Sequence, residues 1–339
     1  MSNSFRQKLS DTKTVLYRRP KEEFQRMLRW GPKAYFLCDT WMKEMEKAAH
    51  TLPQLPSSRS HLPIPLWFLT GNRFWYQTAF CAWTFAKQSG REVILNLVDD
   101  GTLAPEHEEG LRRLFPKGVT VHKSNVQERI DTLLPVERFP ILRQRWSDYI
   151  NIRKLTDIHL GSSGVKLVLD SDMLFFCKPQ AILDWWDSAQ SSGKDPSANY
   201  QLPIANYQLQ PRPYTPLLMT DCEESYGYSR PLMEELAGAP IPRLLNVGIC
   251  GLRSESLDWE ELEHWCRTLL EREGTSYYLE QALVAMLAAR NTPKVMPRSE
   301  YITFPTEQQV LNGSGVLQHY VSDSKPGYFG QAWKLALKS

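Results

Sequence analysis

Two aspartates separated by one residue lie near the middle of this 339-residue chain. Residues 165–169 form a mostly apolar run that leads directly into Asp170, Ser171 and Asp172, and residues 173–176 resume the apolar sequence. Because successive side chains of an extended chain alternate, the two carboxylates project to the same side. Neighbouring carboxylates repel each other, and a shared cation relieves the repulsion. Hard divalent ions such as Mn²⁺ or Mg²⁺, which prefer oxygen ligands, suit this pair.

The run at residues 165–169 also predicts the element that positions the pair. Its aliphatic side chains are typical of a strand that is buried on both faces. In an open α/β sheet, ligands bind in the crevice beyond the carboxyl ends of the strands. The strand would therefore present both carboxylates to a ligand site.

A strand, a helix and a second strand open the main part of the chain. Residues 64–69 and 92–98 read as strands, and a helical pattern from about 75 to 88 lies between them, with Gly90 as its stop. This order implies parallel strands joined by a right-handed crossover. Further elements are expected as a short helix at 111–115, a third strand at 119–122, one helix at 139–160, a strand at 244–251, and helices at 255–273 and 277–289.

The first 60 residues differ in character from the rest of the chain. Apolar side chains recur there at helical spacing among Lys, Arg and Glu, namely Phe24, Met27, Leu28, Met42, Met45 and Ala49. Residues 52–60 contain Pro and Ser and break this periodicity. We interpret residues 1–60 as an N-terminal helical extension and residues 61–339 as one large domain. The apolar faces of the extension are expected to pack on that domain, with membrane contact at most peripheral.

Composition narrows the function classes. Apolar residues at 42% and charged residues at 23% are ordinary for a globular protein, and a net charge of +2 gives no reason to expect a nucleic-acid partner. The six cysteines form no CxxC pair and indicate free thiols in a reducing compartment. The chain begins without an apolar leader and has no run of about 18 apolar residues. We therefore expect a cytoplasmic protein.

The apolar run followed by Asp-x-Asp resembles the signature of nucleotide-sugar-dependent glycosyltransferases of the GT-A fold. Later motifs occur in the order found in glycogenin-like, retaining members of that group: Asn246-Val-Gly248, Glu280-Gln281, and His319 with Lys325-Pro326. The resemblance spans about residues 64–330. It implies a GT-A-like (Rossmann-like) α/β fold, with a mixed, mostly parallel sheet flanked by helices. Glu280 departs from the pattern, because the family has Asp there.

The resemblance implies a metal site and a catalytic pair. Asp170 and Asp172 would bind Mn²⁺ or Mg²⁺, with His319 as the third ligand. Asp170 would also reach the ribose of the donor. Glu280 and Gln281 would face the donor sugar as the catalytic candidates.

The resemblance also implies residues that bind the donor. Gly248, beside Asn246, would let the sugar approach the backbone, and Lys325 would contact the diphosphate. The loop from Thr70 to Arg73 would receive the nucleotide base. A basic residue from the helix at 139–160 would complete the donor site, and the candidates are Arg145, Arg153 and Lys154.

The resemblance implies a hexosyltransferase that needs a metal and uses a nucleoside-diphosphate sugar, with UDP favoured and with retention of configuration. The acceptor, whether saccharide, lipid-linked or protein, is left open, and the Pro- and Tyr-rich residues 188–242 are assigned to its side of the site. Two alternatives also stay open. One is a sugar nucleotidyltransferase, and the other is a non-catalytic sugar-nucleotide-binding paralogue in a polysaccharide-assembly complex.

One further motif is rejected. Val98-Asp-Asp-Gly-Thr102 is similar to the Asp-x-Asp-Gly-Thr motif of haloacid-dehalogenase-type phosphatases. That chemistry needs the first Asp as a covalent nucleophile. Val98 stands at this position and has no nucleophilic atom.

Overall fold

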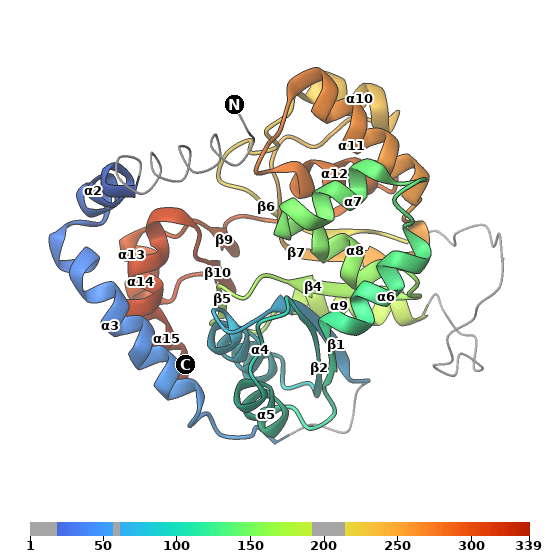
Figure 1. Ribbon diagram of the computed structural model, residues 1–339. Helices are drawn as coiled ribbons and strands as arrows, with labels where there is room; N and C mark the ends of the chain where they lie inside the picture. The colour runs from blue at the N-terminus through green and yellow to red at the C-terminus, as the bar shows by residue number, and fades with distance from the viewer. Residues whose placement is uncertain (1–18, 57–61, 192–213) are drawn as a thin grey trace.

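A computed structural model of the chain describes residues 19–56, 62–191 and 214–339 (Figure 1). Its centre is a seven-stranded sheet in the order β3-β2-β1-β4-β7-β6-β8. Strand β1 pairs in parallel with β2 and β4, β2 with β3, and β6 with β8, whereas β7 is antiparallel to β4 and β6. The predicted mixed, mostly parallel sheet is confirmed. The strands are β1 (Ile64–Thr70), β2 (Val93–Asp99), β3 (Val119–Val121), β4 (Val165–Leu169), β6 (Leu217–Thr220), β7 (Leu245–Arg253) and β8 (Lys294–Met296).

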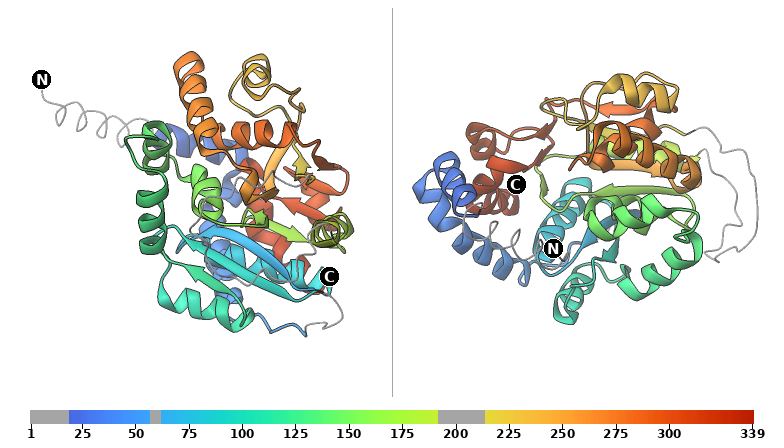
Figure 2. Two further views of the ribbon diagram at one scale, coloured as in Figure 1. Left: turned by 90° about the vertical axis from the view of Figure 1, so that its right-hand side faces the viewer. Right: turned by 45° about the horizontal axis from the view of Figure 1, so that its top comes forward.

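Helices cover both faces of this sheet and create two apolar cores (Figures 1 and 2). Strand β4 supplies both, because Leu167 and Leu169 belong to one core and Val168 to the other. This double burial explains the aliphatic run. The helices are α2 (Arg19–Trp30), α3 (Pro32–Ala49), α4 (Trp75–Ser89), α5 (Pro105–Leu114), α6 (Lys123–Leu133), α7 (Pro140–Asp148), α8 (Arg153–His159), α9 (Gln180–Ser191), α10 (Arg230–Ala237), α11 (Trp259–Glu273), α12 (Leu279–Ala289), α13 (Glu307–Asn312), α14 (Lys325–Gly327) and α15 (Trp333–Lys338).

The predicted strand–helix–strand opening is confirmed. Helix α4 is apolar around nearly its whole circumference and is buried accordingly. It ends at Gly90, whose left-handed φ of 64° is readily adopted by a residue without a Cβ. The crossover then returns the chain to β2, beside β1.

A second, three-stranded sheet carries the chain beyond β4. Its order is β5-β10-β9, with β5 (Met173–Phe175), β9 (Tyr301–Thr303) and β10 (Leu317–His319). The chain leaves the large sheet at the end of β4 and enters the small sheet at β5. Strand β10 is antiparallel to β5, with His319 opposite Met173. This pairing brings the C-terminal part of the chain beside the two aspartates.

The extension packs on the domain through only part of its apolar surface. Met45 and Ala49 of α3 are buried in one of the cores, and Figure 1 shows α3 beside α14 and α15. Phe24 and Leu28 of α2 are exposed, which corrects the expectation that every apolar face would be covered. The reason is that α2 precedes the turn at Gly31 and lies beyond the edge of the core.

The helix expected at 139–160 is broken into α7, a 3₁₀ turn (Ile150–Ile152) and α8. The break occurs at Tyr149, whose backbone is extended, with φ −135° and ψ 97°. Its hydroxyl donates to the Tyr277 carbonyl and accepts from the Glu280 N–H. These long-range hydrogen bonds outweigh the local preference for a continuous helix. The Pro- and Tyr-rich segment assigned to the acceptor side falls largely on residues 192–213, outside the described residues. Within the described parts of the chain, no helix is both long and apolar enough to cross a membrane.

Candidate functional site

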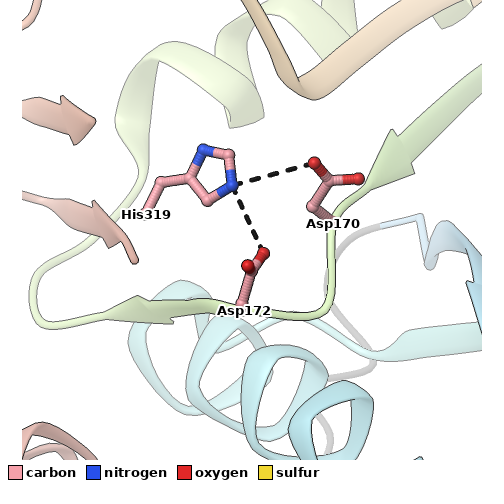
Figure 3. Close-up of side chains that lie close together, drawn as sticks. All are labelled: Asp170, Asp172 and His319. Atoms are coloured by element: carbon pink, nitrogen blue, oxygen red, sulfur yellow. Dashed lines mark ion pairs between the residues drawn. The ribbon is translucent and has the colours of Figure 1, made fainter. Parts of the chain in front are cut away.

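Asp170, Asp172 and His319 converge where the two sheets meet (Figure 3). The Asp170 N–H donates to the Gly248 carbonyl at 2.8 Å, and the Asp172 carbonyl accepts from the Tyr320 N–H at 2.9 Å. These backbone bonds hold one aspartate to each sheet. His319 Nε2 lies 3.3 Å from Asp172 Oδ1 and 3.7 Å from Asp170 Oδ2. One potential ligand atom from each side chain lies within 4.8 Å of the other two.

The side chain of Asn246 determines which nitrogen of His319 carries the proton. Its Oδ1 accepts from the Gly248 N–H at 2.9 Å, while its Nδ2 donates to Asp221 Oδ2 at 3.2 Å, so the amide orientation is set from both ends. His319 Nδ1 lies 3.2 Å from Oδ1 and must be the donor, because this oxygen can only accept. When the ring is neutral, its Nε2 lone pair is therefore directed at the two carboxylates.

This donor set fits a divalent cation. Two carboxylates and an imidazole lone pair face one another at short range, and all three are acceptors when the ring is neutral. A metal ion relieves the repulsion among them. The Nδ1–H hydrogen bond to an amide oxygen is the arrangement found behind metal-binding histidines, where it fixes the ring and makes Nε2 a better ligand.

Two lysines neutralise the aspartates from opposite sides. Lys154 Nζ donates to Asp170 Oδ1 at 2.9 Å and lies 3.4 Å from Glu280 Oε2. Lys325 donates to Asp172 Oδ2. Burial would raise the pKa of Asp172, but the charge of Lys325, together with that of His319 when its ring is protonated, outweighs burial and holds that pKa well below its ordinary value. Asp172 is therefore ionised at neutral pH.

Glu280 differs from the aspartates in its electrostatics. Burial raises its pKa to about 7, the charge of Asp170 acts in the same direction, and Lys154 opposes both. Burial alone would lower the pKa of Lys154, but the carboxylates of Asp170 and Glu280 raise it above its ordinary value. Lys154 thus stays charged between the two carboxyl groups.

A cavity of about 670 Å³ opens over this cluster. Its size is within the range of small-molecule sites. Predicted site residues that line it are Lys154, Asp170, Asn246, Gly248, Glu280, Gln281 and His319. Tyr277, Tyr278 and Phe304 are exposed aromatic side chains on its lining. The structure thus gathers most of the predicted donor and catalytic residues around one opening.

Asp221 belongs to this site and was missed from the sequence. It follows β6 directly, is buried, and accepts from Asn246 Nδ2 and from Gln281 Nε2, each at 3.2 Å. It therefore orients the amide that orients His319. The short apolar run 217–219 ending in a polar pair was the available signal, but a four-residue strand after a Pro-rich stretch is hard to recognise.

Gly248 has a local structural role. A Cβ at this position would lie 2.5 Å from His319 Cε1 and 2.9 Å from Asn246 Oδ1. Neither atom can move away without breaking the hydrogen bond between the two side chains. Any larger residue would therefore displace the imidazole.

Thr70 and Arg73 do not line the cavity. Thr70 is buried, and its hydroxyl lies 2.9 Å from that of Thr78, which in turn lies 2.8 Å from the Ser171 hydroxyl. This chain of contacts supports the loop between the aspartates. Arg73 is exposed with its guanidinium 5.3 Å from the Phe74 ring centroid. Their roles toward a nucleotide base stay predictions.

Of the three basic candidates on the segment 139–160, only Lys154 reaches the aspartates. Arg145, whose side chain is mostly buried, pairs with Asp148 at 3.3 Å and donates to the Thr275 hydroxyl at 3.1 Å. Arg153 donates to the Trp146 carbonyl at 3.1 Å. The break at Tyr149 separates α7 from α8 and thus separates Arg145 from the site.

No protein-family model matches the sequence, and no curated protein matches it significantly. Among solved structures, mouse xyloside xylosyltransferase 1 in its apo form is similar at a TM-score of 0.48 with 13% identity, covering 76% of this chain and 97% of that chain. The bifunctional glycosyltransferase WbbM in its apo form is similar at a TM-score of 0.47 with 9% identity, and the match covers 84% of this chain and 53% of that chain. The galactosyltransferase LgtC with donor and acceptor sugar analogues is similar at a TM-score of 0.46 with 12% identity, and the match covers 76% of this chain and 87% of that chain. Because each of these TM-scores is below 0.5, the fold assignment rests on the sheet topology of this chain.

Proposed function

We propose that this chain is a metal-dependent glycosyltransferase that moves a hexose from a nucleoside-diphosphate donor, with UDP as the nucleotide. The observation that carries the proposal is the cluster of Asp170, Asp172 and His319 at the end of β4, with the His319 proton held at Nδ1. Such a donor set at the carboxyl end of a parallel-sheet strand suits a cation that bridges to phosphate oxygens.

A bound Mn²⁺ or Mg²⁺ would offset the negative charge that develops on the leaving diphosphate. Lys325 would add a hydrogen bond to the same phosphate oxygens once it releases Asp172. Lys154 holds Asp170 in place and keeps Glu280 in contact with a positive charge. Asn246 keeps the Nε2 lone pair of His319 directed at the cluster.

Gln281 and Glu280 would face the donor sugar. The Gln281 amide is fixed by hydrogen bonds to Asp221 and to the Ser225 carbonyl, at 3.2 and 2.9 Å, so its place in the cavity is defined before a ligand binds. Glu280 is buried beside Lys154, and its pKa of about 7 leaves it open as the base of an inverting reaction. Retention of anomeric configuration is part of the proposal because the motif order resembles that of retaining enzymes.

The reaction is proposed to take place in the cytoplasm, because all six cysteines are free and four of them are buried. The acceptor is a saccharide, a lipid-linked sugar or a protein. Incubation of the purified chain with a panel of nucleotide sugars and Mn²⁺ tests the proposal, with release of the nucleoside diphosphate as the readout. We expect turnover that stops when a chelator is added.

Tight binding of a nucleotide sugar without turnover of any donor would favour the non-catalytic alternative. Release of pyrophosphate from a nucleoside triphosphate and a sugar phosphate would favour the nucleotidyltransferase. NMR of the first-formed product decides the stereochemistry, and an inverted product would contradict retention.

A further inference from the structure

Exposed apolar side chains gather on α2 and at the start of α3. Phe24, Leu28 and Phe36 are exposed by 57%, 65% and 69%, and they are three of the five most exposed large apolar side chains among the described residues. Phe24 and Leu28 are four residues apart, so they lie on the same face of α2. Exposed apolar groups collected in this way mark a surface that binds something.

The stretch of sequence that carries these side chains has an excess of positive charge. The first 37 residues contain nine Lys and Arg but three Asp and Glu, a net charge of +6, whereas the whole chain carries +2. The remaining residues therefore carry a net −4. Within the described part, Lys33 is exposed three residues before Phe36, whereas Arg26 pairs with Glu23 at 3.3 Å and Arg29 with Asp323 at 3.2 Å. Residues 19–37, which include the exposed apolar side chains, contain five Lys and Arg but two Asp and Glu.

Polar contacts hold α2 to the C-terminal part of the domain. Trp30 Nε1 donates to Asp323 Oδ1 at 3.1 Å, and Arg29 pairs with the same oxygen at 3.2 Å. The segment that contains Asp323 also contributes Ser322 to the cavity lining and carries Lys325. The C-terminal end of α2 is therefore anchored one short segment away from the candidate site.

We propose that the α2 surface, defined by Phe24, Leu28, Phe36 and Lys33, binds an anionic lipid surface. Large apolar side chains flanked by Lys and Arg are typical of helices that lie in the interface of a membrane. The apolar side chains would enter the acyl boundary, and the basic ones would meet anionic headgroups. Binding would place the cavity close to acceptors carried by the membrane. This proposal goes beyond the proposed transfer activity and does not depend on it.

The test is co-sedimentation of the full chain with lipid vesicles. One set contains phosphatidylcholine alone, and the other contains about 30% phosphatidylserine, which gives a negative surface potential. We expect the chain to bind the anionic vesicles at least tenfold more tightly than the neutral ones, and high salt should weaken this binding. Lys33→Gln should weaken binding to the anionic vesicles about fivefold, because each basic residue near a membrane surface contributes about 1 kcal/mol to binding.

Phe24→Ser combined with Leu28→Ser should reduce binding to anionic vesicles at least tenfold. The matched control is Val119→Ser combined with Val136→Ser, two side chains exposed by 56% and 53% elsewhere on the domain, and it should bind like the wild type. Equal binding of the wild type to both vesicle types, an equal loss in the control, or no binding at all would overturn the proposal. A chain that binds no vesicle but elutes as a dimer would assign the surface to a second copy and would overturn it as well.

Discussion

Replacement of Asn246 by Leu should weaken metal binding without removing a ligand. Leu is close to Asn in size but cannot accept the hydrogen bond from His319 Nδ1, which is 3.2 Å long in the native chain. The ring would then be free to rotate or to place its proton on Nε2. Loss of such a supporting contact behind a metal ligand typically costs about 10–100-fold in metal affinity, which corresponds to about 1.4–2.7 kcal/mol.

The same substitution should also lower stability. It leaves the buried Gly248 N–H without its acceptor and deprives Asp221 of one donor. An unsatisfied buried polar group costs about 1–3 kcal/mol. Mn²⁺ titration monitored by electron paramagnetic resonance, which counts the free ion, measures the affinity independently of activity. Chemical denaturation measures the free energy of unfolding.

Gln281→Leu is the matched control for this experiment. This substitution also removes a side chain that donates to Asp221, at 3.2 Å, but the native Gln281 makes no hydrogen bond to His319. A comparable loss of stability is expected, with Mn²⁺ affinity close to that of the wild type. If Asn246→Leu binds Mn²⁺ normally, or if both variants lose affinity to the same extent, the His319 proton does not have this role.

The site and the fold lead to three other predictions. Asp172→Ala should abolish turnover, and it should weaken UDP binding only when metal is present. A metal role would be contradicted if the variant and the chelator-treated wild type both turned over at the normal rate. Burial raises the pKa of Glu280 from 4.5 to about 7, so between these pH values the folded state binds more protons than the unfolded state. The free energy of unfolding should therefore fall by up to about 3 kcal/mol as pH rises from about 4.5 to 7. Denaturation of Glu280→Gln should lack this loss, and an identical pH profile for variant and wild type would count against the raised pKa. Deletion of residues 1–60 should lower the melting temperature or solubility, because it removes Met45 from the core, and a truncated chain of unchanged stability would show that the extension serves a partner instead.

The parts of the fold that the sequence predicts well are those determined by neighbours along the chain. The run at 165–169 is aliphatic because β4 is buried on both faces, and the stop at Gly90 reflects a left-handed φ. Both features leave a local signal. The alternation that places the two carboxylates on one side is equally local, and the close-up shows both directed toward His319 (Figure 3).

Other parts depend on contacts between distant residues and leave little local signal. His319 reaches Asp172 only because β10 pairs with β5, and nothing in the residues around 319 indicates that pairing. The break at Tyr149 depends on a hydroxyl that reaches the backbone of Tyr277. Asp221 could not be assigned because its partners lie 25 and 60 residues further along the chain.

The position of the aspartates between two sheets has a consequence for how a ligand would be held. Asp170 is bonded to β7 of the large sheet, whereas Asp172 is bonded to the residue after β10 of the small one. A cation shared by both would therefore tie the two sheets together at the point where the chain passes from one to the other. Lys325 already contacts Asp172 at this boundary. If Lys325 turned to a diphosphate, Asp172 would lose this positive partner and a bound metal would replace it, so nucleotide and metal would each make the other bind more tightly.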